Sequence, residues 1–497
     1  MSELKNASEA KLIRCIISKQ GKDSKPLGKD MVIAFESTES VGSPFMTGSL
    51  TVSDSKNFIN EYPIEGGENI SIEIKTTFSD APIVYKFVVA SISNKVVKNI
   101  KQAYTLMLCS PEAIVNETVR VLDPLEGTSE NIVKKLLGKE YLASTKELYS
   151  EPSRFQVKMN ASRDRPFDII AKLLKKSVSV KTDYTGKKYK KYEENRQNRP
   201  NSNSKPIKGS AGFFFWETRR GYMFFSIDAL CDSADGKFSA PRLNFVRELT
   251  EKSSEDLFNP DISAWGPYKE AIANTDLERD QRFLISEAGM KSEINLLQSF
   301  RKGKYSSVIV FFNHSTGLYE EYVYNIKESY DNMAHLGGQE SVSLIPNNEK
   351  GELSDYPTRV MTMILDHESW FNESGIANPE DPNATDPNKF ADWQKYYTAQ
   401  GIARAELLRN QEGEIKIPGN PLICAGDKID IRIASKLASE LRKKQPYDEE
   451  SSGVYLIKKV MHIFNFTDGN DGTCKTTLEL FRDSYGVKDL PSNHGNK

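Results

Sequence analysis

The fold is decided by a stretch that reads Gly67-Glu68-Asn69-Ile70-Ser71-Ile72-Glu73-Ile74, which returns near the C-terminus as Gly426-Asp427-Lys428-Ile429-Asp430-Ile431-Arg432-Ile433. In each copy a glycine and an acidic residue precede three isoleucines at every second position. Side chains alternate between the two faces of a strand, so the isoleucines share one face and the polar residues share the other. Both stretches therefore predict strands with one buried face, which is typical of antiparallel sheets.

Three further strand-like segments accompany each stretch, in the same order in both copies. They are 48–52, 84–92 and 104–108 in the first copy, and 413–417, 454–460 and 476–480 in the second. Four elements that return in one order predict a duplicated structural unit. One-face-buried strands joined by short turns are typical of barrels and sandwiches. We therefore expect two tandem, similar antiparallel β-barrels.

The composition is that of a globular protein without a strong charge bias. The 497 residues are 38% hydrophobic and 27% charged, with a net charge of −2, and this length predicts about three domains. Five scattered cysteines without a C-x-x-C motif favour buried thiols in a reducing compartment. The polar, acidic N-terminus and the short apolar runs predict neither a signal peptide nor a membrane span, so we expect folding in the cytoplasm.

Local patterns divide the chain into a mainly β protein with α+β insertions. Pro111 and Pro166 open predicted helices, and Arg219-Arg220-Gly221 is the turn of a predicted hairpin. A second hairpin is predicted at 304–326, and a helix at 390–407. The expected divisions are a first barrel at 1–110, an intermediate α+β domain at 111–235, a connecting segment at 236–290, a discontinuous second barrel at 291–330 and 395–486, an inserted strand and loop segment at 331–394, and a flexible tail at 487–497.

A basic segment lies inside the intermediate domain, at 181–208. It is polar, rich in Asn, Ser and Pro, and predicts a mobile loop. A basic run interleaved with tyrosines is suited to gripping a nucleic-acid backbone, whereas solvated linkers have the same composition. The candidate residues for contact with nucleic acid or a partner are Lys187, Lys188, Lys190 and Lys191.

The sequence predicts no catalytic, cofactor-binding or metal-binding site. His367-Glu368 lacks the second histidine of a zinc-protease helix, and Gly28-Lys29-Asp30 lacks the rest of a phosphate loop. The run Asp468-Gly469-Asn470-Asp471-Gly472 lacks the last ligand of a calcium loop and predicts a hairpin turn. His462 is expected to pack within a strand, and the aromatic run at 213–216 to form a packed sheet face.

The chain resembles the baseplate central hub protein of contractile-tailed (myovirus-type) bacteriophages in three places. The run from Gly48 to Asn57, followed by Pro63-Ile64-Glu65-Gly66-Gly67, resembles that family's N-terminal barrel. The segment 393–408, followed by Gly419-Asn420-Pro421-Leu422 and the second Gly-Asp stretch, resembles its second barrel; related motifs occur in type VI secretion spike proteins. Arg165-Pro166-Phe167-Asp168-Ile169-Ile170 and 215–219 resemble its intermediate domain. The likeness covers most of 10–485, and the departures are 181–208, 241–291 and 435–452.

The resemblance implies a structural virion protein without catalysis or cofactor. It implies a homotrimer whose six barrels form a pseudo-six-fold ring between a three-fold spike below and the hexameric tail tube above, surrounded by baseplate wedge proteins. DNA would pass through the lumen during ejection without specific binding. Two other hypotheses remain: a nucleic-acid-binding protein that acts through 181–208, and a tail-associated wall hydrolase, since tail spikes often carry wall-degrading domains.

Overall fold

The computed structural model describes most of the chain in separate ranges. These are residues 8–19, 24–98, 101–180, 211–232, 263–265, 285–291, 295–314, 317–330, 333–337, 353–364, 371–376, 387–433, 448, 450–468 and 471–486. The predicted loop at 181–208 and most of the predicted insertion at 435–452 lie outside these residues.

The first repeated unit is an antiparallel sheet in which six main strands pair in the order β3-β4-β7-β6-β5-β1. Ile70, Ile72 and Ile74 are almost completely buried on one face, as their alternation predicts. Short β2 adds to β1, and α1 follows β4. The elements are β1 (Glu9–Ser18), β2 (Lys25–Pro26), β3 (Val32–Ser40), β4 (Thr47–Asp54), α1 (Phe58–Glu61), β5 (Asn69–Thr76), β6 (Ser79–Lys98) and β7 (Lys101–Cys109).

The second repeated unit pairs its strands in the same order as the first. In the second unit the strands pair as β20-β21-β22-β19, and in the first unit their counterparts pair as β5-β6-β7-β4. The second-unit strands correspond to the predicted segments 426–433, 454–460, 476–480 and 413–417, in that order. The register also agrees, because Gly48 lies opposite Leu108 and Gly413 opposite Leu480. The strands are β19 (Gln411–Pro418), β20 (Lys428–Arg432), β21 (Gly453–Asp468) and β22 (Asp471–Arg482), with β14 (Glu287–Lys291) beside β19 and β13 (Ser263–Trp265) beside β20.

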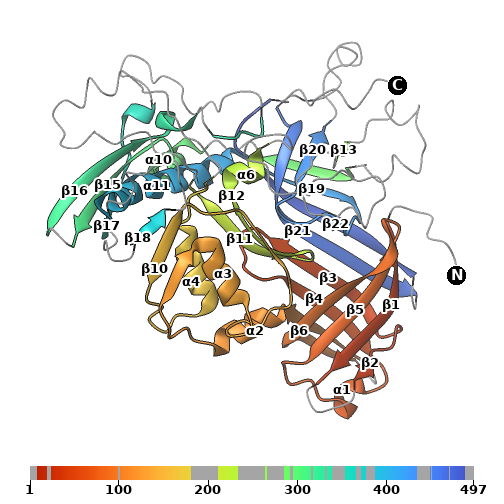
Figure 1. The fold of residues 1–497 in the computed structure, drawn as a ribbon. Helices are drawn as coiled ribbons and strands as arrows, with labels where there is room; N and C mark the ends of the chain where they lie inside the picture. The colour runs from red at the N-terminus through yellow and green to blue at the C-terminus, as the bar shows by residue number, and fades with distance from the viewer. Residues whose placement is uncertain are drawn as a thin grey trace, which may run out of the picture.

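The hairpin β21–β22 belongs to both units. Its distal half pairs with β3 on one side and β1 on the other, and since β21 also pairs with β22, the strands β3-β4-β7-β6-β5-β1-β22-β21 form a closed circuit. Phe464 and Cys474 of this half lie in the apolar core of the first unit, whereas Leu456 and Leu478 lie in that of the second. Figure 1 shows the two units side by side, joined by this long hairpin.

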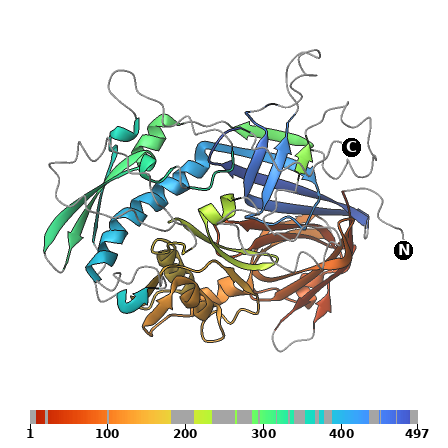
Figure 2. The same cartoon turned by 45° about the horizontal axis from the view of Figure 1, so that its top comes forward.

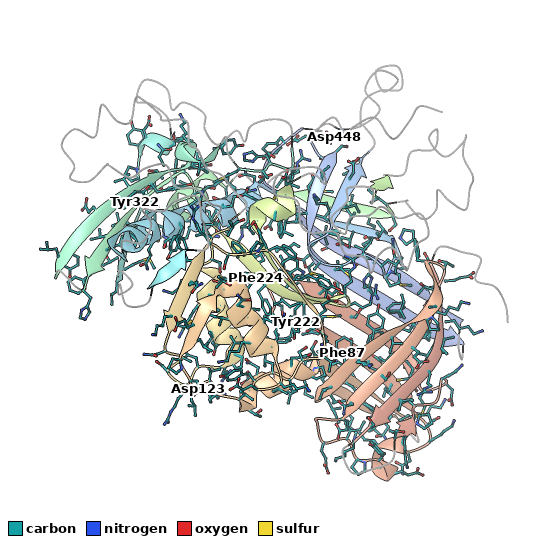
Figure 3. The ribbon with its side chains drawn as sticks, viewed as in Figure 1. Phe87, Asp123, Tyr222, Phe224, Tyr322 and Asp448 are labelled. Atoms are coloured by element: carbon teal, nitrogen blue, oxygen red, sulfur yellow. The ribbon has the colours of Figure 1, made fainter. Side chains whose placement is uncertain are left out.

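The intermediate part combines short helices with two small sheets, β18-β10-β8 and β11-β12-β9. Helices begin at Pro111 and near Pro166, and the predicted hairpin forms around Arg220. Figure 3 shows Tyr222 and Phe224 of β12 between the helices and the first unit. The elements are α2 (Pro111–Thr118), β8 (Leu125–Thr128), α3 (Ser129–Leu137), β9 (Leu148–Ser150), β10 (Phe155–Met159), α4 (Pro166–Leu174), β11 (Phe213–Thr218), β12 (Gly221–Ser226), α6 (Ile227–Cys231) and β18 (Phe371–Ile376).

A third body holds the sheet β16-β15-β17, with α11 against one face. The sequence places 291–330 in the second barrel, but β15 pairs with β16 on one side and with β17 on the other instead of with β19–β22. Periodicity identifies such a hairpin without identifying its neighbour. Figure 2 shows α11 running from this sheet towards the second unit. The elements are α10 (Leu296–Lys302), β15 (Ser306–Asn313), β16 (Leu318–Asn325), β17 (Arg359–Ile364) and α11 (Pro387–Leu407).

Candidate functional site

The turn that opens the second strand of the first unit is closed by a buried acid. Gly67 has a φ of +88°, a region that favours glycine, and its N–H donates to the carbonyl of Val89 at 2.8 Å. The N–H of Val89 donates to the carbonyl of Glu68 at 2.9 Å. The Glu68 carboxylate is completely buried and accepts the N–H groups of Glu65 at 2.8 Å and Gly66 at 3.0 Å. The acid therefore holds the turn in shape.

The second unit builds the same turn with the same backbone contacts, but its acid accepts one backbone N–H where Glu68 accepts two. Gly426 has a φ of +90° and donates to Ile457 at 2.9 Å, while Ile457 donates to the carbonyl of Asp427 at 2.9 Å. The Asp427 carboxylate accepts a hydrogen bond from the N–H of Cys424, three residues earlier, at 2.9 Å. It also accepts hydrogen bonds from both terminal nitrogens of the Arg220 guanidinium, at 2.7 and 2.9 Å. Burial lowers the pKa of Arg220, but the charge and hydrogen bonds of Asp427, together with Cys424 and Glu39, outweigh burial and raise it.

Glu39 ties the first unit to this second turn. It lies on β3 and is 2% exposed. Its carboxylate accepts the N–H groups of Arg219 at 2.8 Å and of Ala425 at 3.0 Å. Burial raises the pKa of Glu39 to about 7, although these donors and the neighbouring guanidinium groups act in the opposite direction. The carbonyl of Ala425 accepts the indole N–H of Trp216 at 2.8 Å, so the hairpin β11–β12 is fixed to the same point.

Glu217 ties the same hairpin to the first unit at the start of β4, across the β3–β4 turn from Glu39. Its carboxylate accepts the N–H of Met46 at 2.9 Å and lies 2.6 Å from the ammonium of Lys146. Lys146 also pairs with the buried Glu112 at 2.7 Å. Burial raises the pKa of Glu217, and Lys146 opposes that rise. One ammonium group therefore bridges two buried carboxylates between helix α2 and strand β11.

Arg404 ties α11 to the second unit through a fully buried charge cluster. Its guanidinium pairs with Asp228 at 2.9 Å and with Asp483 at 2.8 Å, and it donates to the carbonyl of Ala334 at 2.5 Å. His335 contacts Asp483 at 2.8 Å through Nδ1. Burial favours the protonated form of Asp483, but Arg404 and then His335 outweigh it and hold the pKa well below its usual range.

These clusters fix how the parts of the chain sit against one another. Each joins segments that are far apart in sequence, and buried charges are destabilising unless their partners are held in good geometry. A displacement of the hairpin β11–β12 relative to the two repeated units would separate Arg220 from Asp427 and Glu217 from the N–H of Met46. The arrangement is therefore suited to transmitting load rigidly between the two repeated units.

The residues singled out in the sequence have different outcomes. Lys187, Lys188, Lys190 and Lys191 lie outside the described residues. His462 is buried in β21 and contacts the hydroxyl of Thr476 and the carbonyl of Ile423, which confirms its packed position. The burial of Phe213, Phe215 and Trp216 likewise confirms the packed aromatic face.

Within the described ranges, no three His, Cys, Asp or Glu side chains come together as a possible metal site. In the same ranges, no helix is both long and apolar enough to cross a bilayer.

Sequence reasoning missed most of the residues that make the junctions. Glu39, Glu217 and Arg404 look like ordinary polar residues in their local patterns. The one available signal was Arg219-Arg220-Gly221, where two arginines lie in the turn of an apolar hairpin. Their partners come from residues more than 150 positions away, so spacing along the chain could not reveal them.

Comparison with known proteins finds similarity only among solved structures. No family model and no curated protein matches the chain. A tail protein from Neisseria meningitidis MC58 is 10% identical, with 95% of this chain and 96% of that chain covered and a TM-score of 0.44. The prophage MuSo2 43 kDa tail protein from Shewanella oneidensis is 8% identical, with 95% and 98% covered and a TM-score of 0.42. An E. coli component of the type VI secretion system is 10% identical, with 95% and 79% covered and a TM-score of 0.38.

These similar structures are phage tail and type VI secretion proteins, the classes that the sequence resembles. Identities of 8–10% and TM-scores of 0.38–0.44 support no inference about the fold or the function of this chain. The function must therefore be argued from the chain's own residues.

Proposed function

We propose that this chain is a structural component of a phage tail baseplate, namely its central hub. Three copies form a homotrimer in which six repeated units make a pseudo-six-fold ring. The ring joins a three-fold spike to the hexameric tail tube, is held by surrounding wedge proteins, and encloses part of the channel through which DNA is ejected. The chain acts in the virion by binding these partners and not by catalysis.

The observation that carries the proposal is the agreement of the two repeated units in contact detail. The strands pair as β5-β6-β7-β4 in the first unit and as β20-β21-β22-β19 in the second, and in both units the first of these strands follows the Gly-acid turn. Both have the same bulge, between Val89 and Ser91 in β6 and between Ile457 and Lys459 in β21. Two equivalent units per chain allow three chains to offer six equivalent seats, which one unit per chain cannot do.

The buried junctions support a role in transmitting force. A hub must keep its two units in one relative orientation while the tail acts on it. Glu39, Arg220 and Asp427 join the first unit, the hairpin β11–β12 and the second unit in one buried cluster. A chain with a net charge of −2 has no global positive charge to retain DNA, as a conduit requires.

The test is the solution mass of the purified protein, alone and mixed with its own phage's spike and tube proteins. Light scattering after size exclusion should give three times the chain mass of 56.0 kDa for the free trimer, and that mass plus the mass of the bound partners for a complex. A protein that stays at 56.0 kDa with both partners present would contradict the hub.

A variant with serine at Lys187, Lys188, Lys190 and Lys191 serves as a matched control. It should assemble as the wild type does, because the ring is built by the repeated units. Loss of assembly in this variant, together with salt-sensitive DNA binding by the wild type, would favour the nucleic-acid hypothesis instead.

A further inference from the structure

The hairpins β21–β22 and β6–β7 are equivalent and have a bulge in the same place. They differ in which strands pair with the part of the hairpin beyond that bulge. In β21 the residues after the bulge, 459–465, pair with β3 on the side away from β22. Phe464 lies opposite Phe35, is completely buried, and stacks on the Phe35 ring at a centroid distance of 5.8 Å. This segment of the second unit thereby completes the first.

The corresponding segment of β6 is uncovered. Its pairing with β5 ends at Val88, and from Ser91 onwards its only partner among the described strands is β7. Gln102 and Cys474 are equivalent, because each lies six residues before the equivalent leucines Leu108 and Leu480. Val97 lies opposite Gln102, and Phe464 lies opposite Cys474. Val97 therefore occupies in β6 the place that Phe464 occupies in β21. Yet Val97 is 65% exposed and the neighbouring Val96 61%.

The strand that corresponds to β3 in the second unit is also uncovered. Ala288 of β14 lies opposite Ile415 of β19, as Phe35 of β3 lies opposite Leu50 of β4. Whereas β3 has β21 on its other side, β14 ends its sheet within the described part of the chain. Ala288 is exposed in the place where Phe35 is completely buried.

We infer that the open edge of β6 in one copy pairs, antiparallel, with the open edge of β14 in the next copy. Since Phe464 lies opposite Phe35 within one chain, the equivalent register places Val97 opposite Ala288 of the neighbouring copy. The inference rests on the proposed homotrimer, because the partner is a second copy of this chain. Its physical basis is that an unpaired strand edge readily accepts another strand, and exposed valines gain by burial.

The contact joins two different surfaces of the chain, so each copy offers one edge to the next. Such a heterologous contact closes into a ring when its rotation permits. The hairpin β21–β22 closes the first unit within a chain, and β6 would close the second unit between chains. Asn94, at a φ of 51°, and exposed Lys95 interrupt the β6 edge, which restricts indiscriminate pairing with other edges.

The test is a disulfide between neighbouring copies in the full-length protein. Val97→Cys and Ala288→Cys together should give covalent dimers and trimers on non-reducing gels, since directly opposed residues lie within disulfide range. The five native cysteines are buried and can remain. The matched control is Val84→Cys with Ala288→Cys, because Val84 is an exposed valine of β6 at its covered end. The control should remain uncrosslinked.

The outcomes separate the inference from the hub proposal. A wild type that stays at 56.0 kDa with its partners overturns both. A trimer in which the Val97 and Ala288 cysteines do not crosslink, or crosslink no more than the control, overturns the edge pairing alone.

A second variant, Val97→Asp, tests the same contact without oxidation. The site is exposed in a single chain, so the variant should keep the wild-type circular dichroism and melting temperature at dilutions where the protein is monomeric. It should remain at 56.0 kDa where the wild type is trimeric. A normal trimer from this variant would overturn the pairing.

Discussion

Alanine at Gly426 is expected to destabilise the protein more than alanine at Gly67, although both glycines hold the same place in the repeated turn. Their φ angles are +90° and +88°, so the backbone strain on an added Cβ, about 1–2 kcal/mol, is the same at both sites. The surroundings differ. Nothing lies within 4 Å of a Cβ at Gly67, whereas a Cβ at Gly426 would lie 2.3 Å from Cζ2 of Trp216.

Trp216 cannot move aside without loss. Its side chain is completely buried, and its indole N–H donates to the carbonyl of Ala425 at 2.8 Å. Overpacking of a core costs about 1–3 kcal/mol, and a lost hydrogen bond adds about 1 kcal/mol. Gly426→Ala should therefore cost about 2–4 kcal/mol more than Gly67→Ala.

The assay is urea denaturation followed by tryptophan fluorescence and circular dichroism, with the transition midpoints of the two variants compared. A chain of this length need not unfold in two states, so the comparison uses midpoints within one matched pair. Replacing Trp216 with Phe should recover part of the loss in the Gly426→Ala background and none in the Gly67→Ala background. Equal midpoints for the two alanine variants would refute the reasoning.

Three further predictions concern buried titratable side chains. Burial raises the pKa of Glu39 to about 7 from its usual 4.5, so the folded state keeps a proton that the unfolded chain loses. That contribution to stability, roughly 3 kcal/mol, should be lost as the pH rises from 4.5 to 7, and Glu39→Gln should abolish this slope in urea midpoints at pH 5, 6 and 7.5. Burial lowers the pKa of His462 to about 3 from 6.5, so its contribution should be lost as the pH falls below 6.5, and His462→Gln should remove this opposite slope in the same midpoints. Arg404→Met leaves Asp228 and Asp483 buried without their guanidinium partner and should lower the free energy of unfolding by about 3–5 kcal/mol. Arg404→Lys should recover little of this loss, because an ammonium group cannot reproduce the planar guanidinium contacts. A melting temperature unchanged by Arg404→Met would show that the cluster is dispensable.

Sequence reasoning recovered the strands and the repeat well, for a local reason. Ile70 and Ile429 lie on faces set by the two-residue period, and that period is visible in any window of the sequence. Pro111 and Pro166 likewise mark helix starts because proline fits the first turn. The assignment of 291–330 differs from the observed pairing because a hairpin's own pattern does not identify the sheet it joins.

By itself the sequence determined which residues face a core, where the helices at Pro111 and Pro166 begin, and that one four-strand unit occurs twice. Only the tertiary structure decided which edges meet: that β21 crosses to cover β3, that the Arg220 turn reaches Asp427, and that β6 and β14 end without a described neighbour. The physical reason is that side-chain alternation specifies the faces of a strand, whereas its edges present the same backbone N–H and C=O groups whatever the sequence. Neighbours along an edge are therefore chosen by the packing of whole units.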